Sequence, residues 1–175
     1  MIFPLAFFCY VNYNVNIEVV ESGINEHKNP TEKAVSGMTG EYQHTLDAKG
    51  RLFIPAKLRD ELGGIFFVTV SPEECLSAYS AESWNELSDK VNGMPYSKQR
   101  KMRPIFAYAT KCELDGQGRI LLPQNLREFA KLTKNVTVVG NNNHAEFWDA
   151  GNWIKVHKEE VTPENIMSVM EELDF

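Results

Sequence analysis

The stretch LDAKGRLFIP, residues 46–55, decides the fold, because a close copy of it, LDGQGRILLP, returns at residues 114–123. The offset between the two stretches is 68 residues. Shorter matches follow in the same order: Val68-Thr69-Val70 with Val136-Thr137-Val138 and, after a one-residue shift, Trp84 with Trp153. Agreement in order over this length indicates an internal repeat. We therefore predict two copies of one unit, at about residues 40–92 and 108–160.

Each copy opens with a strand, a tight turn and a second strand. Residues 47–50 and 115–118 place an aspartate first and a glycine last, which suits a turn that needs side-chain capping and a positive φ. We expect the strands that flank each turn to pair as a β-hairpin. Two further strands follow in each copy, and a helix containing Trp84 or Trp153 closes it. The expected strands are 42–46, 52–54, 65–70 and 76–79, then 109–114, 120–122, 136–139 and 145–148.

A helix follows each hairpin. The prolines Pro55 and Pro123 are predicted at its first position, where the missing N–H costs nothing. Apolar residues at spacing i, i+4 then form the buried face: Leu58 and Leu62 in the first copy, Leu126 and Ala130 in the second. A unit of about 50 residues is marginally stable alone, so the two copies are expected to share one core.

The amino-terminal residues 1–37 do not match the repeat. They are predicted to be an unstructured extension, or to precede a biological start at Met38. The apolar run at residues 2–11 is shorter than the ~20 residues that a membrane span needs, which makes a signal anchor the weaker alternative.

Charge is distributed unevenly along the chain. Of the formal net charge of -6, residues 1–37 contribute -2 and residues 154–175 contribute -4, while residues 38–153 hold 14 basic and 14 acidic residues. Residues 161–175 form an acidic tail with one more helix expected near its start. Residues 93–107 form a basic linker or helix. Its basic residues, which we interpret as a solvated face, are Lys98, Arg100, Lys101 and Arg103. An acidic total thus excludes only a DNA binder that relies on bulk charge.

The three cysteines and four histidines show no spacing typical of a disulfide framework or a metal site. The sequence also lacks a nucleophile–base pair and a phosphate-binding glycine loop. We therefore expect no enzyme activity, no catalytic residue, no metal or other cofactor, no small-molecule substrate and no membrane partner.

Two motifs carry a resemblance to the MraZ family of bacterial regulators. They are HTLDAKGRLFIPAKLR at residues 44–59 and CELDGQGRILLP at residues 112–123, and the resemblance covers about residues 38–160. It implies an α+β fold with two tandem AbrB-like (SpoVT-AbrB) units of swapped-hairpin, double-psi barrel-like type. These units would form one pseudo-symmetric, β-barrel-type domain with flanking helices.

The same resemblance implies a function. Such a protein would be a sequence-specific transcriptional regulator of the division and cell-wall gene cluster, cytoplasmic and associated with the nucleoid. It would bind short direct repeats in double-stranded DNA upstream of its own operon, as a ring-shaped homo-oligomer. The DNA-contacting lysine and arginines of the family correspond to Lys49, Arg51 and Arg119. Lys57 and Arg59, on the helix after the first hairpin, complete the candidate DNA contacts, although Arg59 also suits a pairing within the fold.

Two alternatives stay open at the level of sequence. A basic hairpin tip can enter a DNA groove, where arginine pairs with guanine and lysine lies near phosphate. Arg51 and Arg119 can instead pair internally with Asp47 and Asp115, which recur beside them. The alternative function is an oligomeric protein-interaction scaffold of the same fold without DNA binding.

Overall fold

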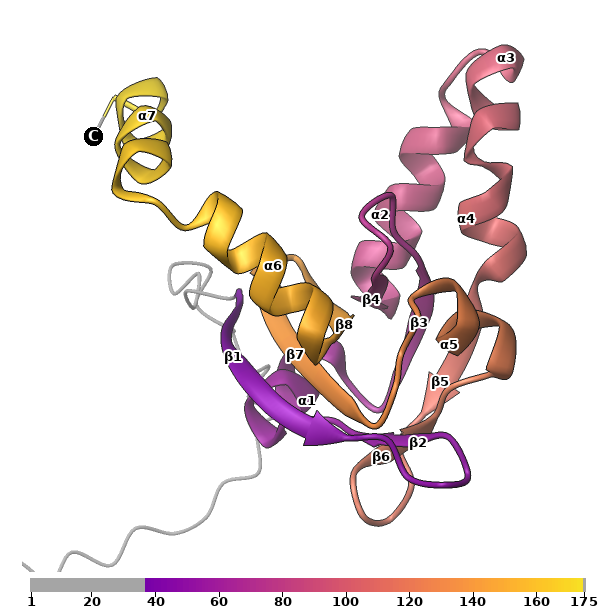
Figure 1. Cartoon of the computed structure of the whole chain (residues 1–175). Coiled ribbons are helices and arrows are strands. Elements are labelled where there is room, and N and C mark those ends of the chain that lie inside the picture. Colours follow the sequence, from indigo (N-terminus) through magenta and orange to yellow (C-terminus); the bar gives the residue numbers. More distant parts are fainter. Residues whose placement is uncertain (1–36, 175) are drawn as a thin grey trace, which may run out of the picture. The chain divides into compact units, whose positions relative to one another are not determined.

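The alternation of apolar and polar residues predicts short strands, and the structure, a computed structural model that describes residues 37–174, contains eight of them (Figure 1). The predicted extension, residues 1–37, lies outside the described residues except for Gly37. The strands are β1 (Met38–Thr45), β2 (Arg51–Phe53), β3 (Ile65–Val70), β4 (Leu76–Ser80), β5 (Thr110–Glu113), β6 (Arg119–Leu121), β7 (Asn135–Asn142) and β8 (His144–Asp149). The helices are α1 (Ala56–Leu62), α2 (Ala81–Asn92), α3 (Tyr96–Gln99), the 3₁₀ helix η1 (Arg100–Met102), α4 (Arg103–Tyr108), α5 (Gln124–Phe129), α6 (Ala150–Glu160) and α7 (Pro163–Glu172).

Strand pairing joins the two copies in both sheets. The larger sheet is antiparallel and has the order β1-β7-β8-β4-β3-β5. Exchanging the copies replaces β1 by β5, β7 by β3 and β8 by β4, and the order then reads the same backwards. The chain is therefore a pseudo-dimer, with its pseudo-twofold axis between β4 and β8.

The predicted hairpins are wrong in their strand pairing. The first turn closes as expected, with the Gly50 N–H donating to the Asp47 carbonyl at 2.9 Å. Beyond the turn, β1 pairs with β7, while β2 pairs with β6 of the other copy in a separate two-stranded ribbon. One isolated bridge, Leu46–Leu52, joins the strands that flank this turn. An alternating pattern shows that a strand buries one face, but it does not specify the neighbouring strand.

The α+β class is confirmed, but the expected β-barrel is not closed. Within residues 37–174, β1 and β5 remain the edges of an open six-stranded sheet, and the β2–β6 ribbon is a second sheet. The boundaries 40–92 and 108–160 stay a prediction, since strands of both copies interleave in one sheet.

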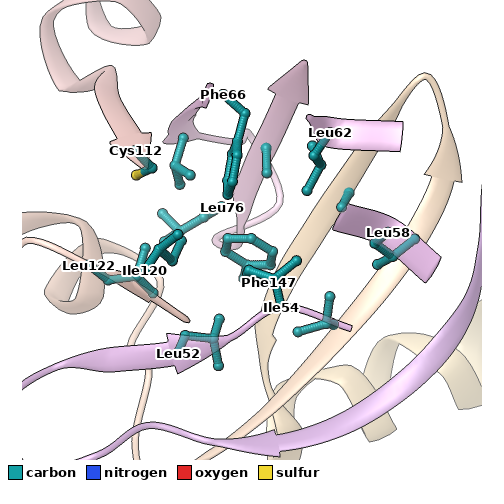
Figure 2. Close-up of a cluster of buried hydrophobic side chains, with 14 of the residues drawn as sticks. Leu52, Ile54, Leu58, Leu62, Phe66, Leu76, Cys112, Ile120, Leu122 and Phe147 are labelled. Atoms are coloured by element: carbon teal, nitrogen blue, oxygen red, sulfur yellow. The ribbon is translucent and has the colours of Figure 1, made fainter. Parts of the chain in front are cut away.

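One core lies between the ribbon, the sheet and two helices (Figure 2). Leu52 and Ile120 lie opposite each other in the ribbon, and both are at most 1% exposed. The residues around them come from both copies: Ile54, Leu58, Leu62, Phe66, Leu76, Leu122, Leu126 and Phe147. This confirms the predicted shared core and the predicted apolar faces of the helices after each proline.

The two helices begin one residue later than predicted. Pro55 and Pro123 are the residues before α1 and α5, with extended ψ angles of 137° and 151°. The Pro55 carbonyl still accepts from the Arg59 N–H at 3.0 Å, so the proline starts the hydrogen-bond ladder without an N–H of its own. Helix α1 ends at Gly63, whose φ is 77°.

Two helical extensions complete the described chain. Residues 81–108, here called the helical arm, consist of α2 followed by α3, η1 and α4, which run back along α2 (Figure 1). Trp84 anchors the arm, with its ring 5.0 Å from Phe67 and 5.4 Å from Phe106. The acidic tail forms α7, which starts at Pro163 as predicted and is capped by Thr162. None of the helices among the described residues is long and apolar enough to span a membrane.

Candidate nucleic-acid interface

The two turns have the same hydrogen-bond network. In the first, one carboxylate oxygen of Asp47 accepts from the backbone N–H groups of Lys49 and Arg51, both at 2.9 Å. In the second, Asp115 accepts from Gln117 at 2.9 Å and from Arg119 at 3.0 Å. An aspartate that binds the N–H two residues on is typical of a tight turn, so the sequence interpretation of both turns is confirmed.

The arginine of each turn pairs with the aspartate of the same turn. The Arg51 Nε lies 2.7 Å from Asp47 Oδ2. Arg119 donates from Nε at 2.9 Å and from Nη2 at 2.7 Å to Asp115. The internal pairing left open by the sequence is therefore present, and each guanidinium has a fixed orientation beside its turn.

These contacts favour the ionised carboxylates. The Arg51 backbone N–H and, to a lesser degree, its side chain lower the pKa of Asp47 below its usual value. The side chain of Arg119 is the main cause that lowers the pKa of Asp115 to about 2. Both turns therefore keep their ion pairs at neutral pH.

The copies differ at the tip of the turn. Lys49 is exposed, and within residues 37–174 no hydrogen bond or ion pair engages its ammonium group. The second copy has Gln117 at this position. Arg51 uses one guanidinium nitrogen on Asp47, whereas Arg119 uses two on Asp115. The first turn thus offers more free donors and one more positive charge.

Two arginines that follow the turns, Arg59 on α1 and Arg127 on α5, each support the turn of the opposite copy. The Ile54 N–H donates to the Gly118 carbonyl, and the Leu122 N–H to the Gly50 carbonyl, both at 2.9 Å. The Arg59 guanidinium covers Gly118, so closely that a Cβ there would lie 2.5 Å from its Nη1. Arg127 covers Gly50 in the same way and also donates from Nε to the Leu122 carbonyl at 3.0 Å.

Two of the candidate DNA contacts are therefore not part of the tip. Arg59 packs between Gly118 and the Phe53 ring, with its Cζ 5.3 Å from the ring centroid. Lys57 donates to the Thr39 hydroxyl at 3.2 Å, at the end of β1 far from the turn. Eight strand residues span about 26 Å, so Lys57 does not join Lys49. At the level of sequence, Arg127 matches Arg59 at the 68-residue offset, and both suit a solvated position or a pairing within the fold. The structure shows that each supports a turn of the other copy.

Replacing Gly118 by alanine tests this support. Its φ is 74°, a left-handed conformation that costs other residues about 1–2 kcal/mol, and Arg59 would have to move. We expect Gly118→Ala to lower the free energy of unfolding by about that amount in urea titration. Gly64→Ala is the control, because no atom lies within 4 Å of its added Cβ. Equal stabilities of the two variants would contradict the packing of Arg59 on this turn.

A second polar cluster lies on β8, away from the turns. Glu146 is 7% exposed, and its carboxylate accepts from Asn141 at 2.9 Å, from Trp148 at 2.9 Å and from His144 at 3.2 Å. Burial alone would raise its pKa, but these hydrogen bonds outweigh burial and lower the pKa of Glu146 to about 2. The carboxylate is ionised at neutral pH and stabilises this end of the sheet.

Acid unfolding should report on Glu146. Its pKa is depressed in the folded state, so its contribution to stability is complete above about pH 4.5 and is lost as the pH falls toward 2. The shift corresponds to roughly 3 kcal/mol. We expect Glu146→Gln to be less stable at pH 6 and to lose less stability between pH 4.5 and 2 than the unsubstituted chain. Parallel pH profiles in chemical denaturation would contradict this.

One group of potential metal ligands occurs among the described residues. Donor atoms of Glu73, Cys75 and Glu146 lie within 4.8 Å of one another. The Glu146 oxygens already accept three hydrogen bonds, and burial raises the pKa of Cys75 to about 12, which keeps the thiol protonated. A metal binds the thiolate, so we assign no metal here.

These observations define a class of protein: a single-chain pseudo-dimer whose two repeats exchange strands and present two aspartate-anchored turns beside a shared ribbon (Figure 1). The family model described as "MraZ protein, putative antitoxin-like" matches the chain twice, at residues 38–103 and 105–170. The chain belongs to the MraZ family, a family of transcriptional regulators and not of enzymes. The resemblance and the internal repeat are thereby confirmed.

Several relatives are similar over most of the repeat region. A protein of Caldicellulosiruptor bescii named "Transcriptional regulator MraZ" is 41% identical over 140 residues, which cover 78% of this chain and 98% of that protein. Proteins of the same name from Moorella thermoacetica and Carboxydothermus hydrogenoformans are 47% and 45% identical over 117 residues, covering 65% of this chain and 82% of each relative.

Proposed function

We propose that this protein is a sequence-specific DNA-binding transcriptional regulator of the division and cell-wall gene cluster, acting in the cytoplasm on the nucleoid. The observation that carries the proposal is the exposed Lys49 beside an arginine held by Asp47, in a chain whose relatives are named transcriptional regulators. Arginine with two free guanidinium nitrogens can pair with guanine O6 and N7, and a tip lysine lies near phosphate.

The proposed mechanism is multivalent. Each chain binds one short direct repeat upstream of its own operon weakly, through the turn with Lys49 and Arg51. A ring of chains then places further turns near neighbouring repeats, which raises their effective concentration. Because Gln117 replaces the lysine in the second copy, the second turn contributes less, with Arg119 as its main cation.

Lys49→Ala tests the phosphate contact. We expect the affinity for a labelled duplex from the region upstream of the gene to fall about tenfold, and the salt slope of binding to decrease by about one counterion. The measurement is fluorescence anisotropy at two or more salt concentrations. Lys155 is an exposed lysine on α6, so Lys155→Ala serves as the control and should leave the affinity unchanged.

The same titration decides between the two functions. A scaffold without DNA binding is favoured by the pairing of both turn arginines with aspartates, which reduces the positive charge of the tips. If the unsubstituted chain binds neither the upstream duplex nor a scrambled duplex of equal length at either salt concentration, DNA regulation is wrong and the scaffold function stands. Equal binding to both duplexes would contradict sequence-specific regulation.

A further inference from the structure

The carboxyl-terminal helix α7 has an apolar face that is exposed among the described residues, 37–174. Along it and at its C-cap, Ile166, Val169, Met170 and Leu173 recur at positions i, i+3, i+4 and i+7 and are 45–60% exposed. This is the spacing by which an amphipathic helix inserts side chains into a groove. Within residues 37–174, side-chain hydrogen bonds tie α7 to the chain before it, such as those of Asn165 to the carbonyls of Glu159 and Glu160.

The helical arm presents a matching groove. Its volume is about 300 Å³, and its lining combines apolar Val91, Tyr96 and Phe106 with Arg100 and Arg103. The Tyr96 side chain is 73% exposed at its rim. An apolar groove edged by arginines fits an apolar helix flanked by carboxylates.

The charges of the two surfaces are opposite. Residues 93–108 of the arm contain four basic residues and no acidic one, whereas residues 159–174 contain six acidic residues and no basic one. This acidity also argues against an anionic lipid surface as the partner of α7.

We propose that α7 of one copy docks in the arm groove of a second copy, head to tail. The inference rests on the proposed homo-oligomer and names the surfaces that join its chains. Because helix and groove are different surfaces, the contact is heterologous, and repetition of it closes into a ring when the rotation between neighbours permits.

Complementation between two defective chains tests the contact. The first variant, Ile166→Glu with Met170→Glu, loses the apolar face of α7 but keeps the arm. The second, Tyr96→Glu with Arg100→Glu, loses the groove but keeps α7. All four positions are exposed, so the fold should persist, which circular dichroism checks. Ser168→Glu, at an exposed α7 position outside the apolar face, is the control. It should keep the oligomeric mass of the unsubstituted chain.

We expect each variant alone to be monomeric by sedimentation equilibrium, and an equimolar mixture to form one-to-one dimers of twice that mass. In such a dimer, the Tyr96→Glu, Arg100→Glu variant contributes its intact α7, and the Ile166→Glu, Met170→Glu variant contributes its intact groove. Variants that retain the oligomeric mass alone, a mixture that stays monomeric, or an unsubstituted chain that is itself monomeric would overturn the proposal.

Binding of the monomeric variants to a duplex with a single repeat separates this inference from the DNA function. Unchanged single-repeat affinity supports the DNA function whatever the mass measurements show. Loss of DNA binding by every chain, with complementation intact, leaves the docking proposal standing and removes the DNA function.

Discussion

Arg51→Ala should abolish operator-specific DNA binding while leaving the oligomer unchanged. The Asp47 carboxylate holds Nε of Arg51 at 2.7 Å, which leaves both terminal nitrogens of the guanidinium available. One bidentate arginine–guanine pair contributes about 1–3 kcal/mol of discrimination, and a multivalent assembly loses it at every repeat. In anisotropy titrations, the affinity for the upstream duplex should fall to that for a scrambled duplex.

Two further variants sharpen this test. Arg51→Lys keeps the charge but not the planar pair of donors, so it should retain nonspecific affinity and lose specificity. Arg119→Ala should lower the affinity less, because two guanidinium nitrogens of Arg119 already donate to Asp115. If Arg51→Ala binds the operator as tightly as the unsubstituted chain does, Arg51 is not part of the DNA interface.

Phe147→Ala should lower the free energy of unfolding by about 3–5 kcal/mol. Phe147 is 0% exposed and lies on β8 between its pairing partners Val138 on β7 and Leu76 on β4. Its ring belongs, with Ile54, to the core that both copies share (Figure 2). Since β8 adjoins the pseudo-twofold axis, the cavity would weaken both copies together.

Guanidinium titration followed by circular dichroism measures this loss. Phe129→Ala, at a side chain 37% exposed on α5, is the control and should cost less than 1 kcal/mol. If Phe147→Ala fails to fold, Phe147→Leu should still fold, with a loss of about 1.5 kcal/mol or less. A cost for Phe147→Ala no greater than that of Phe129→Ala would contradict a single shared core.

Local sequence predicted the parts of this protein well. The strand predicted at residues 65–70 agrees with β3. The first helix ends before Gly63, and the helix expected near the start of the acidic tail begins at Pro163. The turns also form as expected, because an aspartate and a positive-φ glycine encode a turn within four residues. These features depend on neighbours in the chain, so the sequence pattern suffices for them.

The candidate site was predictable only in part. The positions of Lys49, Arg51 and Arg119 followed from the repeat and the resemblance. The packing of Arg59 against Gly118, and of Arg127 against Gly50, joins residues of different copies. No spacing along one copy could indicate it.

By itself, the sequence determined that the chain holds two copies of one unit, which elements each copy contains, and that the net charge of -6 resides at the ends. The tertiary structure alone decided that β2 pairs with β6, that the sheet stays open, and that the helix arginines brace the opposite turns. The physical reason is that the sequence pattern shows which face of a strand is buried but not which strand lies beside it. A strand of either copy could complete the hydrogen bonds and cover the same face. Only packing of all the apolar faces into one core selects the exchanged arrangement.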